Sequence, residues 1–275
     1  MSDLSDVEID ALADLAGRLA DAAGRASLPH FRADALVTDN KLDGKDFDPV
    51  TVADRAAEQA IRDVLGQERP DDGIFGEEQA RTEGTSGLTW VLDPIDGTAP
   101  FIAGIPVYGT LIGLARCGRP WLGVIDHPAT SDRWVGVSGE WATLNGAAVR
   151  TRRCPDLAPA LMTNSNPDFF NGAERRTFEA LRTRVRYTQY GGSCYAYGVL
   201  ASGRTDLAVD GGLDPFDIFA PAAVIEGAGG RITDWSGQRF TLGWAGRVLA
   251  AGDPDLHAQA LAVLQSSAGS GDRLS

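Results

Sequence analysis

One short segment constrains the fold and the chemistry of this chain more than any other. Residues 90–92 form an apolar run typical of a buried strand, and the run ends at two carboxylates, Asp93 and Asp96, followed by Gly97 and Thr98. Mg²⁺ prefers oxygen ligands and is usually bound by a few carboxylates together with waters and phosphate oxygens. The segment therefore predicts a cation site at the end of a core strand, where the amides of Gly97 and Thr98 could hold a phosphate.

Four blocks, spread along the chain in a fixed order, resemble the signatures of the inositol monophosphatase-like, Mg²⁺-dependent phosphatases. They are Gly76-Glu77-Glu78, Asp93-Pro94-Ile95-Asp96-Gly97-Thr98, Asp214-Pro215-Phe216-Asp217 and Ile225-Glu226-Gly227-Ala228-Gly229-Gly230. One block alone would be moderately specific, whereas all of them in order argue against a chance match. The resemblance covers about residues 12–264, which is nearly the whole chain.

The order of helical and strand patterns favours a layered α/β (α+β) architecture. The resemblance narrows this to a five-layer αβαβα sandwich of the inositol monophosphatase and fructose-bisphosphatase type. We expect an N-terminal half over residues 1–155 with most of the metal ligands, a C-terminal half over 156–265 with the last metal ligand and the specificity residues, and a disordered tail over 266–275. At 275 residues, the chain is long enough to bury a substantial core.

Local patterns predict individual elements. Ser5 and Glu8 stand at capping-box spacing before a helical stripe of apolar residues, and Asp214-Pro215 is typical of the start of another helix. Asn145-Gly146 predicts a tight turn, and residues 38–49 read as a polar loop. Further helices are expected at 51–65, 175–183, 194–201 and 254–264, and further strands at 107–115, 121–125, 133–139, 161–163 and 205–209.

The resemblance implies a metal centre. The side chains of Glu77, Asp93, Asp96 and Asp217 and the carbonyl oxygen of Ile95 would bind two or three Mg²⁺ ions. Two ions about 3.5–4 Å apart can clamp both the attacking and the leaving oxygen of an in-line displacement. For a single carboxylate, surface solvation or helix capping is the ordinary alternative, and a helix dipole alone could explain Asp217.

The resemblance also implies a water-activating pair, Asp54 and Thr98, with Glu77 as a third catalytic residue. Asp54 follows Thr51 at capping-box spacing, so a charge at a helix N-terminus explains it equally well. Thr98 could likewise cap the segment that follows it. Capping and catalysis are compatible, and both interpretations stay open.

The leaving group of the substrate is expected to meet the C-terminal half. Gly192 and Ser193 lie in a glycine-rich segment before a predicted helix, where the backbone can approach a ligand closely. Asp210 ends a predicted strand, at the place where the family has an acid that contacts the alcohol part of the substrate. A helix start for Ser193 and a turn carboxylate for Asp210 are the alternatives.

Composition limits the partners. The formal net charge of −13 disfavours nucleic acid and anionic membranes, because both would be repelled. A small phosphomonoester is also an anion, so it can bind only where local cations make the electrostatic potential positive, as Mg²⁺ on a carboxylate cluster would. The sequence shows no signal peptide and no apolar run long enough for a membrane span, so we expect a cytoplasmic protein. The resemblance implies a homodimer.

Cysteines and histidines suggest no second site. The three cysteines are widely spaced and form no disulfide framework or zinc pattern, which indicates reduced thiols: Cys117, Cys154 and Cys194. The three histidines have no ligand spacing and read as surface or packing residues: His30, His127 and His257.

Three local patterns are most similar to the histidinol-phosphate phosphatase branch of the family. They are Gly109-Thr110-Leu111-Ile112, Arg133-Trp134-Val135-Gly136-Val137 and Gly192-Ser193-Cys194-Tyr195-Ala196-Tyr197, although Ser193 and Ala99 depart from the usual pattern of that branch. The predicted reaction is hydrolysis of L-histidinol phosphate in histidine biosynthesis, with Asp210 suited to a cationic substrate. The alternative is a phosphatase for myo-inositol 1-phosphate or another small sugar phosphate, and a remote one is a silent binding protein on the same scaffold.

Overall fold

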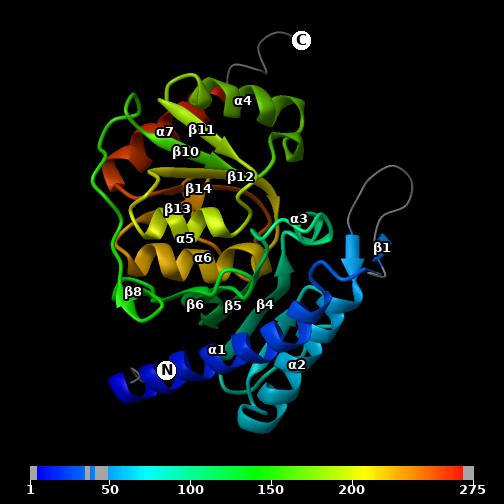
Figure 1. The fold of residues 1–275 in the computed structure, drawn as a ribbon. Helices are drawn as coiled ribbons and strands as arrows, with labels where there is room; N and C mark the ends of the chain where they lie inside the picture. The colour runs from blue at the N-terminus through cyan, green and yellow to red at the C-terminus, as the bar shows by residue number, and fades with distance from the viewer. Residues whose placement is uncertain (1–4, 35–37, 41–48, 269–275) are drawn as a thin grey trace.

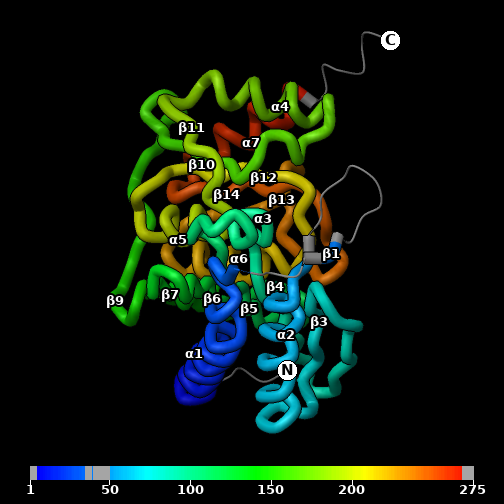
Figure 2. The backbone as a smooth tube through the Cα atoms, turned by 45° about the vertical axis from the view of Figure 1, so that its right-hand side comes forward, coloured from blue at the N-terminus to red at the C-terminus, as the bar shows by residue number. Residues whose placement is uncertain are grey.

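The computed structural model describes residues 5–34, 38–40 and 49–268, and Figures 1 and 2 show the path of the chain. The first half contains α1 (Asp6–Ser27), β1 (Thr38–Asn40), β2 (Pro49–Thr51), α2 (Val52–Glu68), β3 (Gly73–Gly76), β4 (Leu88–Asp96), α3 (Thr98–Ile102), β5 (Gly109–Arg116), β6 (Arg119–His127), β7 (Asp132–Val137), β8 (Trp141–Leu144) and β9 (Ala147–Ala148). The second half contains β10 (Leu161–Asn164), α4 (Gly172–Arg182), β11 (Tyr187–Tyr190), α5 (Tyr195–Ala201), β12 (Leu207–Leu213), α6 (Pro215–Gly227), β13 (Arg231–Asp234), β14 (Gly246–Ala251) and α7 (Pro254–Ala268).

Five layers alternate between helices and sheets, as Figure 1 shows. The helices α1 and α2 pack together on one face of a seven-stranded sheet, and α5 and α6 cover its other face. A five-stranded sheet follows, with α4 and α7 on its far side. The predicted five-layer αβαβα sandwich is confirmed.

The two sheets differ in topology. The seven strands lie in the order β3-β4-β5-β6-β7-β8-β9, and every neighbouring pair is antiparallel except β3 and β4. The five-stranded sheet has the order β11-β10-β12-β14-β13, in which β10 runs parallel to both β11 and β12. Because the chain leaves β10 for one neighbour and returns to the other side of it, the carboxyl ends of β10 and β12 form a topological switch point, where α/β proteins commonly bind ligands.

The central helix α6 lies very close to the seven-stranded sheet. Three register-matched glycines of β5, β6 and β7 lie beneath it, and a Cβ atom on any of them would collide with α6: Gly113, Gly123 and Gly136. Most residues of α6 are buried, as expected for a helix between two sheets. The close approach brings the first turn of α6 to the end of β4.

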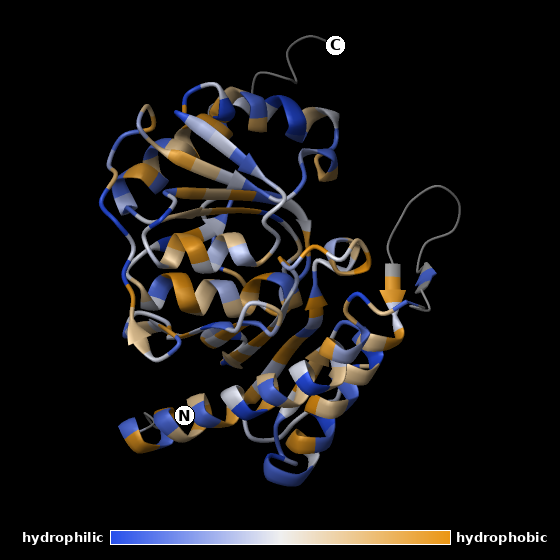
Figure 3. Cartoon of the chain, in the orientation of Figure 1, coloured by the Kyte–Doolittle hydropathy of each residue, from blue (hydrophilic) through white to orange (hydrophobic). Residues whose placement is uncertain are grey.

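The outer helices are amphipathic. In α1 the buried face includes Ile9, Leu12, Leu15 and Leu19, and Figure 3 shows hydrophilic and hydrophobic residues alternating along α1 and α2. The structure confirms the capping box of Ser5 that begins α1. No helix within the described ranges is long and apolar enough to cross a membrane.

Most predicted elements are present with shifted ends. The Asn145-Gly146 turn between β8 and β9 has positive φ at both residues, as a tight hairpin requires. The helix α7 continues to Ala268 and so includes the start of the segment 266–275, of which 269–275 lie outside the described residues. The predicted loop at 38–49 is described only at its ends, where β1 and β2 pair antiparallel.

Candidate active site

A cluster of carboxylates lies where β4 meets the first turn of α6. Asp93, Asp96 and Asp217 each offer one oxygen, and these three atoms lie within 4.8 Å of one another. Side chains three residues apart on a regular strand would point to opposite faces. The register between β4 and β5 shifts between Asp93 and Asp96, and this bulge explains how both side chains reach the same cluster.

Glu77 lies beside this cluster. It follows β3, which pairs parallel with β4, and its amide donates to the carbonyl of Leu92 at 3.1 Å. The negative charge of Glu77 contributes to raising the pKa of Asp93 and of Asp217, which places the fourth predicted acidic ligand with the other three. We refer to Glu77, Asp93, Asp96 and Asp217 as the acidic cluster.

The acidic cluster is electrostatically unfavourable without a cation. Burial, together with the charges of Glu77, Asp96 and Asp217, raises the pKa of Asp93 well above its usual range. Burial and the charge of Asp96 do the same to the pKa of Asp217. A hard divalent cation fits this set, because all four donors are carboxylates and their charges repel unless positive charge lies between them.

Asp54 and Thr98, predicted as a pair, lie together. The Thr98 hydroxyl is 3.4 Å from Asp54 Oδ1 and 3.0 Å from the carbonyl oxygen of Ile95. Asp54 is 1% exposed, and its Oδ2 accepts from the amide of Thr51 at 2.7 Å and from its hydroxyl at 2.5 Å. Asp54 therefore caps α2, which confirms that interpretation, and it also faces Thr98, as the predicted water-activating pair requires.

The segment after β4 joins the two halves of the site. Gly97 is the N-cap of α3, and the side chain of Ser193 lies against it, since a Cβ on Gly97 would be 2.8 Å from Ser193 Oγ. Ser193 has a φ of 44°. Gly192 precedes it, and the next amide, that of Cys194, donates to Asp96 Oδ2 at 2.7 Å. The predicted Gly192-Ser193 segment thus contacts the end of β4.

Asp210 lies at the switch point of the five-stranded sheet and is 2% exposed. Its Oδ1 accepts from Asn164 Nδ2 at 3.0 Å and from the amide of Ser165 at 2.6 Å, and its Oδ2 accepts from the hydroxyl of Tyr197 at 2.7 Å. Burial raises the pKa of Asp210, and the nearby charge of Asp96 adds to this rise. We call Asp210, Asn164 and Tyr197 the switch-point cluster.

Sequence reasoning missed two partners of Asp210. Asn164 is 1% exposed, and its Nδ2 also donates to the carbonyl of Val209 at 2.7 Å. Its Oδ1 has no hydrogen-bond partner. Asn164 Nδ2 faces two oxygens, those of Val209 and Asp210. A flipped amide would place Oδ1 against both, so the network fixes which side-chain atom of Asn164 is the nitrogen and which is the oxygen. The asparagine at the end of a predicted strand was the only available signal.

The sequence indicates a surface or packing role for His127 and a reduced thiol for Cys194, without relating the two residues to each other. His127 Nδ1 is 2.6 Å from the carbonyl oxygen of Tyr108, and its Nε2 is 3.7 Å from the Cys194 thiol. Burial lowers the pKa of His127 to about 4, so the imidazole is neutral and Nε2 can accept from the thiol. The pair lies directly behind the amide that binds Asp96, and nothing in the spacing of the two residues predicts it.

The comparisons with known proteins agree with this geometry. The model of the inositol monophosphatase family matches residues 8–268. The bifunctional phosphatase IMPL2 of Arabidopsis thaliana is 42% identical over 96% of this chain and 78% of its own length. The histidinol-phosphatase of Chlorobaculum parvum is 34% identical over 86% of this chain and 90% of its own length. A solved structure of an inositol monophosphatase from Zymomonas mobilis has a TM-score of 0.83 and 43% identity, covering 95% of this chain and 100% of that one. The chain therefore belongs to the inositol monophosphatase family and is a phosphatase, a phosphoric monoester hydrolase.

Proposed function

We propose that this phosphatase hydrolyses L-histidinol phosphate to L-histidinol and phosphate, with Mg²⁺ bound by the acidic cluster and by the carbonyl oxygen of Ile95. The observation that carries the metal assignment is the crowding of Asp93, Asp96 and Asp217 within 4.8 Å. When bound, Mg²⁺ supplies positive charge that offsets the phosphate oxygens and the carboxylates around them. Two or three ions per site, a cytoplasmic location and a homodimeric assembly belong to the same proposal.

The proposed role of Asp54 and Thr98 is to orient the attacking water. If the Thr98 hydroxyl donates to Asp54 Oδ1, the lone pairs of Thr98 Oγ1 are free to accept a proton of that water. The two bonds from Thr51 fix Asp54 and keep Oδ1 directed at Thr98. The amides of Gly97 and Thr98 are proposed to contact the phosphate, and Glu77 to serve both as ligand and as part of the catalytic set.

The switch-point cluster supports the choice of substrate. Asp210 is a carboxylate at the carboxyl end of β12, close enough to the acidic cluster that the charge of Asp96 raises its pKa, so its negative charge favours a leaving group that carries positive charge or donates hydrogen bonds. Histidinol carries an ammonium group and an imidazole, both of which donate hydrogen bonds. Gly192 and Ser193 are proposed to line the same side of the substrate. The histidinol-phosphatase of Chlorobaculum parvum, at 34% identity, points to this chemistry as well.

A phosphatase for myo-inositol 1-phosphate is the second candidate. The solved relative from Zymomonas mobilis is called an inositol monophosphatase and is 43% identical, and the Arabidopsis thaliana relative is called bifunctional. The hydroxyl groups of a polyol can also donate to Asp210. Relatives with both kinds of name therefore keep this alternative open.

Phosphate release from four substrates distinguishes the candidates. The panel is histidinol phosphate, myo-inositol 1-phosphate, fructose 1,6-bisphosphate and 3′-phosphoadenosine 5′-phosphate, each with Mg²⁺ and with EDTA. We expect the highest kcat/KM for histidinol phosphate, and we expect EDTA to abolish phosphate release from every substrate. A preference for inositol 1-phosphate would assign the second function, and equal turnover in EDTA would overturn the metal assignment.

A further inference from the structure

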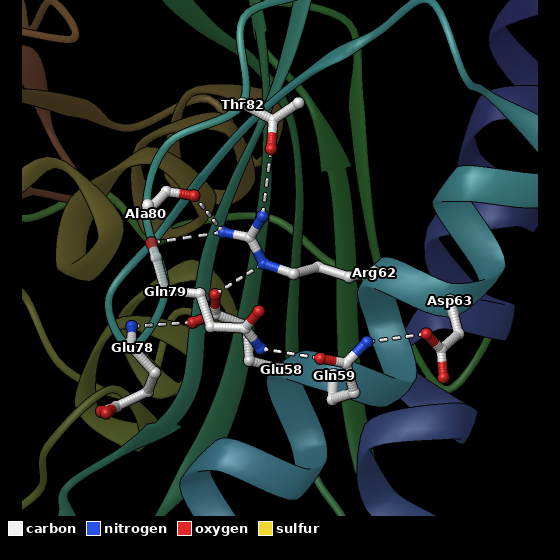
Figure 4. A network of polar contacts seen from close by, with 8 residues as sticks. All are labelled: Glu58, Gln59, Arg62, Asp63, Glu78, Gln79, Ala80 and Thr82. Atoms are coloured by element: carbon white, nitrogen blue, oxygen red, sulfur yellow. Dashed lines mark hydrogen bonds and ion pairs between the residues drawn. The ribbon is translucent and has the colours of Figure 1, made fainter.

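A second buried carboxylate lies on α2, one turn after Asp54, and has no role in the proposed mechanism. Glu58 is 0% exposed, and its Oε1 accepts from Arg62 Nε at 2.8 Å while its Oε2 accepts from the amide of Glu78 at 2.8 Å. Figure 4 shows this carboxylate between the guanidinium and the backbone of the segment that follows β3. Both oxygens are engaged, so Glu58 is a satisfied buried charge.

The contacts of Glu58 fall on both sides of Glu77. The backbone of Gly76 packs directly on the carboxylate, and a Cβ atom at that position would collide with it. The amide of Glu78, on the other side, donates to Glu58. Glu77 itself donates its amide to Leu92, in the strand that carries Asp93. Three consecutive residues are thereby held, and the backbone from which the Glu77 side chain projects has a fixed position.

Arg62 extends the same contact along the chain. Its guanidinium is directed at the carbonyls of Gln79 at 3.3 Å and Ala80 at 3.2 Å, and at the hydroxyl of Thr82 at 3.3 Å. The planar fork of an arginine can serve several acceptors in one plane, which a lysine cannot do. The side chain of Arg62 is only 11% exposed, so it pairs with Glu58 in a largely water-free setting. The pair therefore joins α2 to residues 76–82, and Figure 4 shows its bonds to Glu78, Gln79, Ala80 and Thr82.

We propose that Glu58 and Arg62 are positioning residues that hold Glu77 in the geometry for cation binding. This inference rests on the proposed role of Glu77 as a ligand. Neither residue touches the cation. Both act through the backbone of Gly76, Glu77 and Glu78, and the glycine at position 76 is required because the carboxylate occupies the space of its side chain.

Mg²⁺ affinity measured by isothermal titration calorimetry tests the proposal without relying on turnover. Glu58→Gln keeps the shape of the side chain but sets an amide NH₂ group against one of its two donors. We expect a rise of about 10- to 100-fold in the Kd for Mg²⁺, the usual cost of losing a group that orients a ligand. Arg62→Lys keeps the charge but loses the fork, and should raise the Kd by a smaller factor. Glu68→Gln, the same change at an exposed position near the end of the same helix, is the matched control and should bind Mg²⁺ like the wild type.

The reference variant Glu77→Gln separates this proposal from the one on which it rests. If Glu77→Gln weakens Mg²⁺ binding while folded Glu58→Gln and Arg62→Lys bind as the wild type does, the positioning role is wrong and the metal assignment stands. If Glu77→Gln itself leaves the Kd unchanged, the ligand role of Glu77 fails first. If Glu58→Gln does not fold, the Kd of Arg62→Lys for Mg²⁺ decides whether the positioning role is right. With raised Mg²⁺, we expect the kcat of either folded variant to return toward the wild-type value, which a purely structural defect would not produce.

Discussion

The two ends of the site solve opposite electrostatic problems. In the acidic cluster, burial and mutual repulsion raise the pKa of Asp93 and Asp217 well above their usual range. In the switch-point cluster, a single carboxylate, Asp210, is met by three donors of the protein, which fix its position. The first arrangement gains stability when a cation binds, whereas the second is held in shape beforehand. In the proposed function, the acidic cluster binds the phosphate through its cations, and the switch-point cluster presents a fixed surface to the leaving group.

The largest effect should follow removal of one charge from the acidic cluster. Asp93→Asn or Asp96→Asn should lower kcat/KM on the order of 1000-fold or more, as expected when a preorganised electrostatic contact to the transition state is lost. The same change relieves repulsion between like charges, so the melting temperature of the metal-free protein should not fall. Phosphate release with Mg²⁺ measures the first effect, and thermal unfolding in EDTA measures the second. A folded Asp96→Asn protein with wild-type activity would show that the acidic cluster does not need all its charges, and would contradict the proposed electrostatic difference between the two ends.

Loss of the Thr98 hydroxyl should have the next largest effect. Thr98→Ala should lower kcat by about 10²- to 10⁴-fold, the range for a group that assists proton transfer, with a much smaller change in KM. Thr98→Ser keeps the hydroxyl near Asp54 and should retain most of the activity. Steady-state kinetics at saturating Mg²⁺ provide the comparison. A raised KM at constant kcat would instead assign Thr98 to ground-state phosphate binding.

A change at Asp210 tests the other end of the site. Asp210→Asn removes the charge, and the lost charge-assisted contact, worth about 1.5–3 kcal/mol, should lower kcat/KM for histidinol phosphate by roughly 10- to 150-fold. A neutral polyol phosphate should lose less, because asparagine still bonds to hydroxyl groups. Tyr197→Phe removes one of the three donors but keeps the charge, so it controls for disturbance of the cluster. Equal losses for both substrates in Asp210→Asn would end the histidinol-phosphate assignment.

The ends of the site also differ in how far the sequence predicts them. Three of the four members of the acidic cluster are flanked by motifs with local physical meaning, because Asp93 and Asp96 end an apolar run and Asp217 opens a helix. The order of helical and strand patterns predicts only a layered architecture of helices and strands, and the five-layer order comes from the resemblance. Asn164, Tyr197 and His127, in contrast, acquire their roles only through partners far along the chain, such as Asp210 and Cys194. No spacing rule links such residues, so only the folded structure identifies them.

An effect on stability alone, and none on the chemistry, is expected from His127, which lies behind the contact between the two ends. Its pKa in the folded protein is about 4, below the value of about 6.5 for the unfolded chain. As the pH falls from about 6.5 to 4, the unfolded chain therefore takes up a proton that the folded protein does not, and stability decreases in that window and no further below it. One such proton corresponds to a slope of about 1.4 kcal/mol per pH unit. Urea unfolding in EDTA at several pH values should show this slope reduced by that amount in His127→Gln relative to the wild type. Identical slopes in the two proteins would mean that His127 is protonated in the folded state, and that its Nε2 does not accept the proton of Cys194.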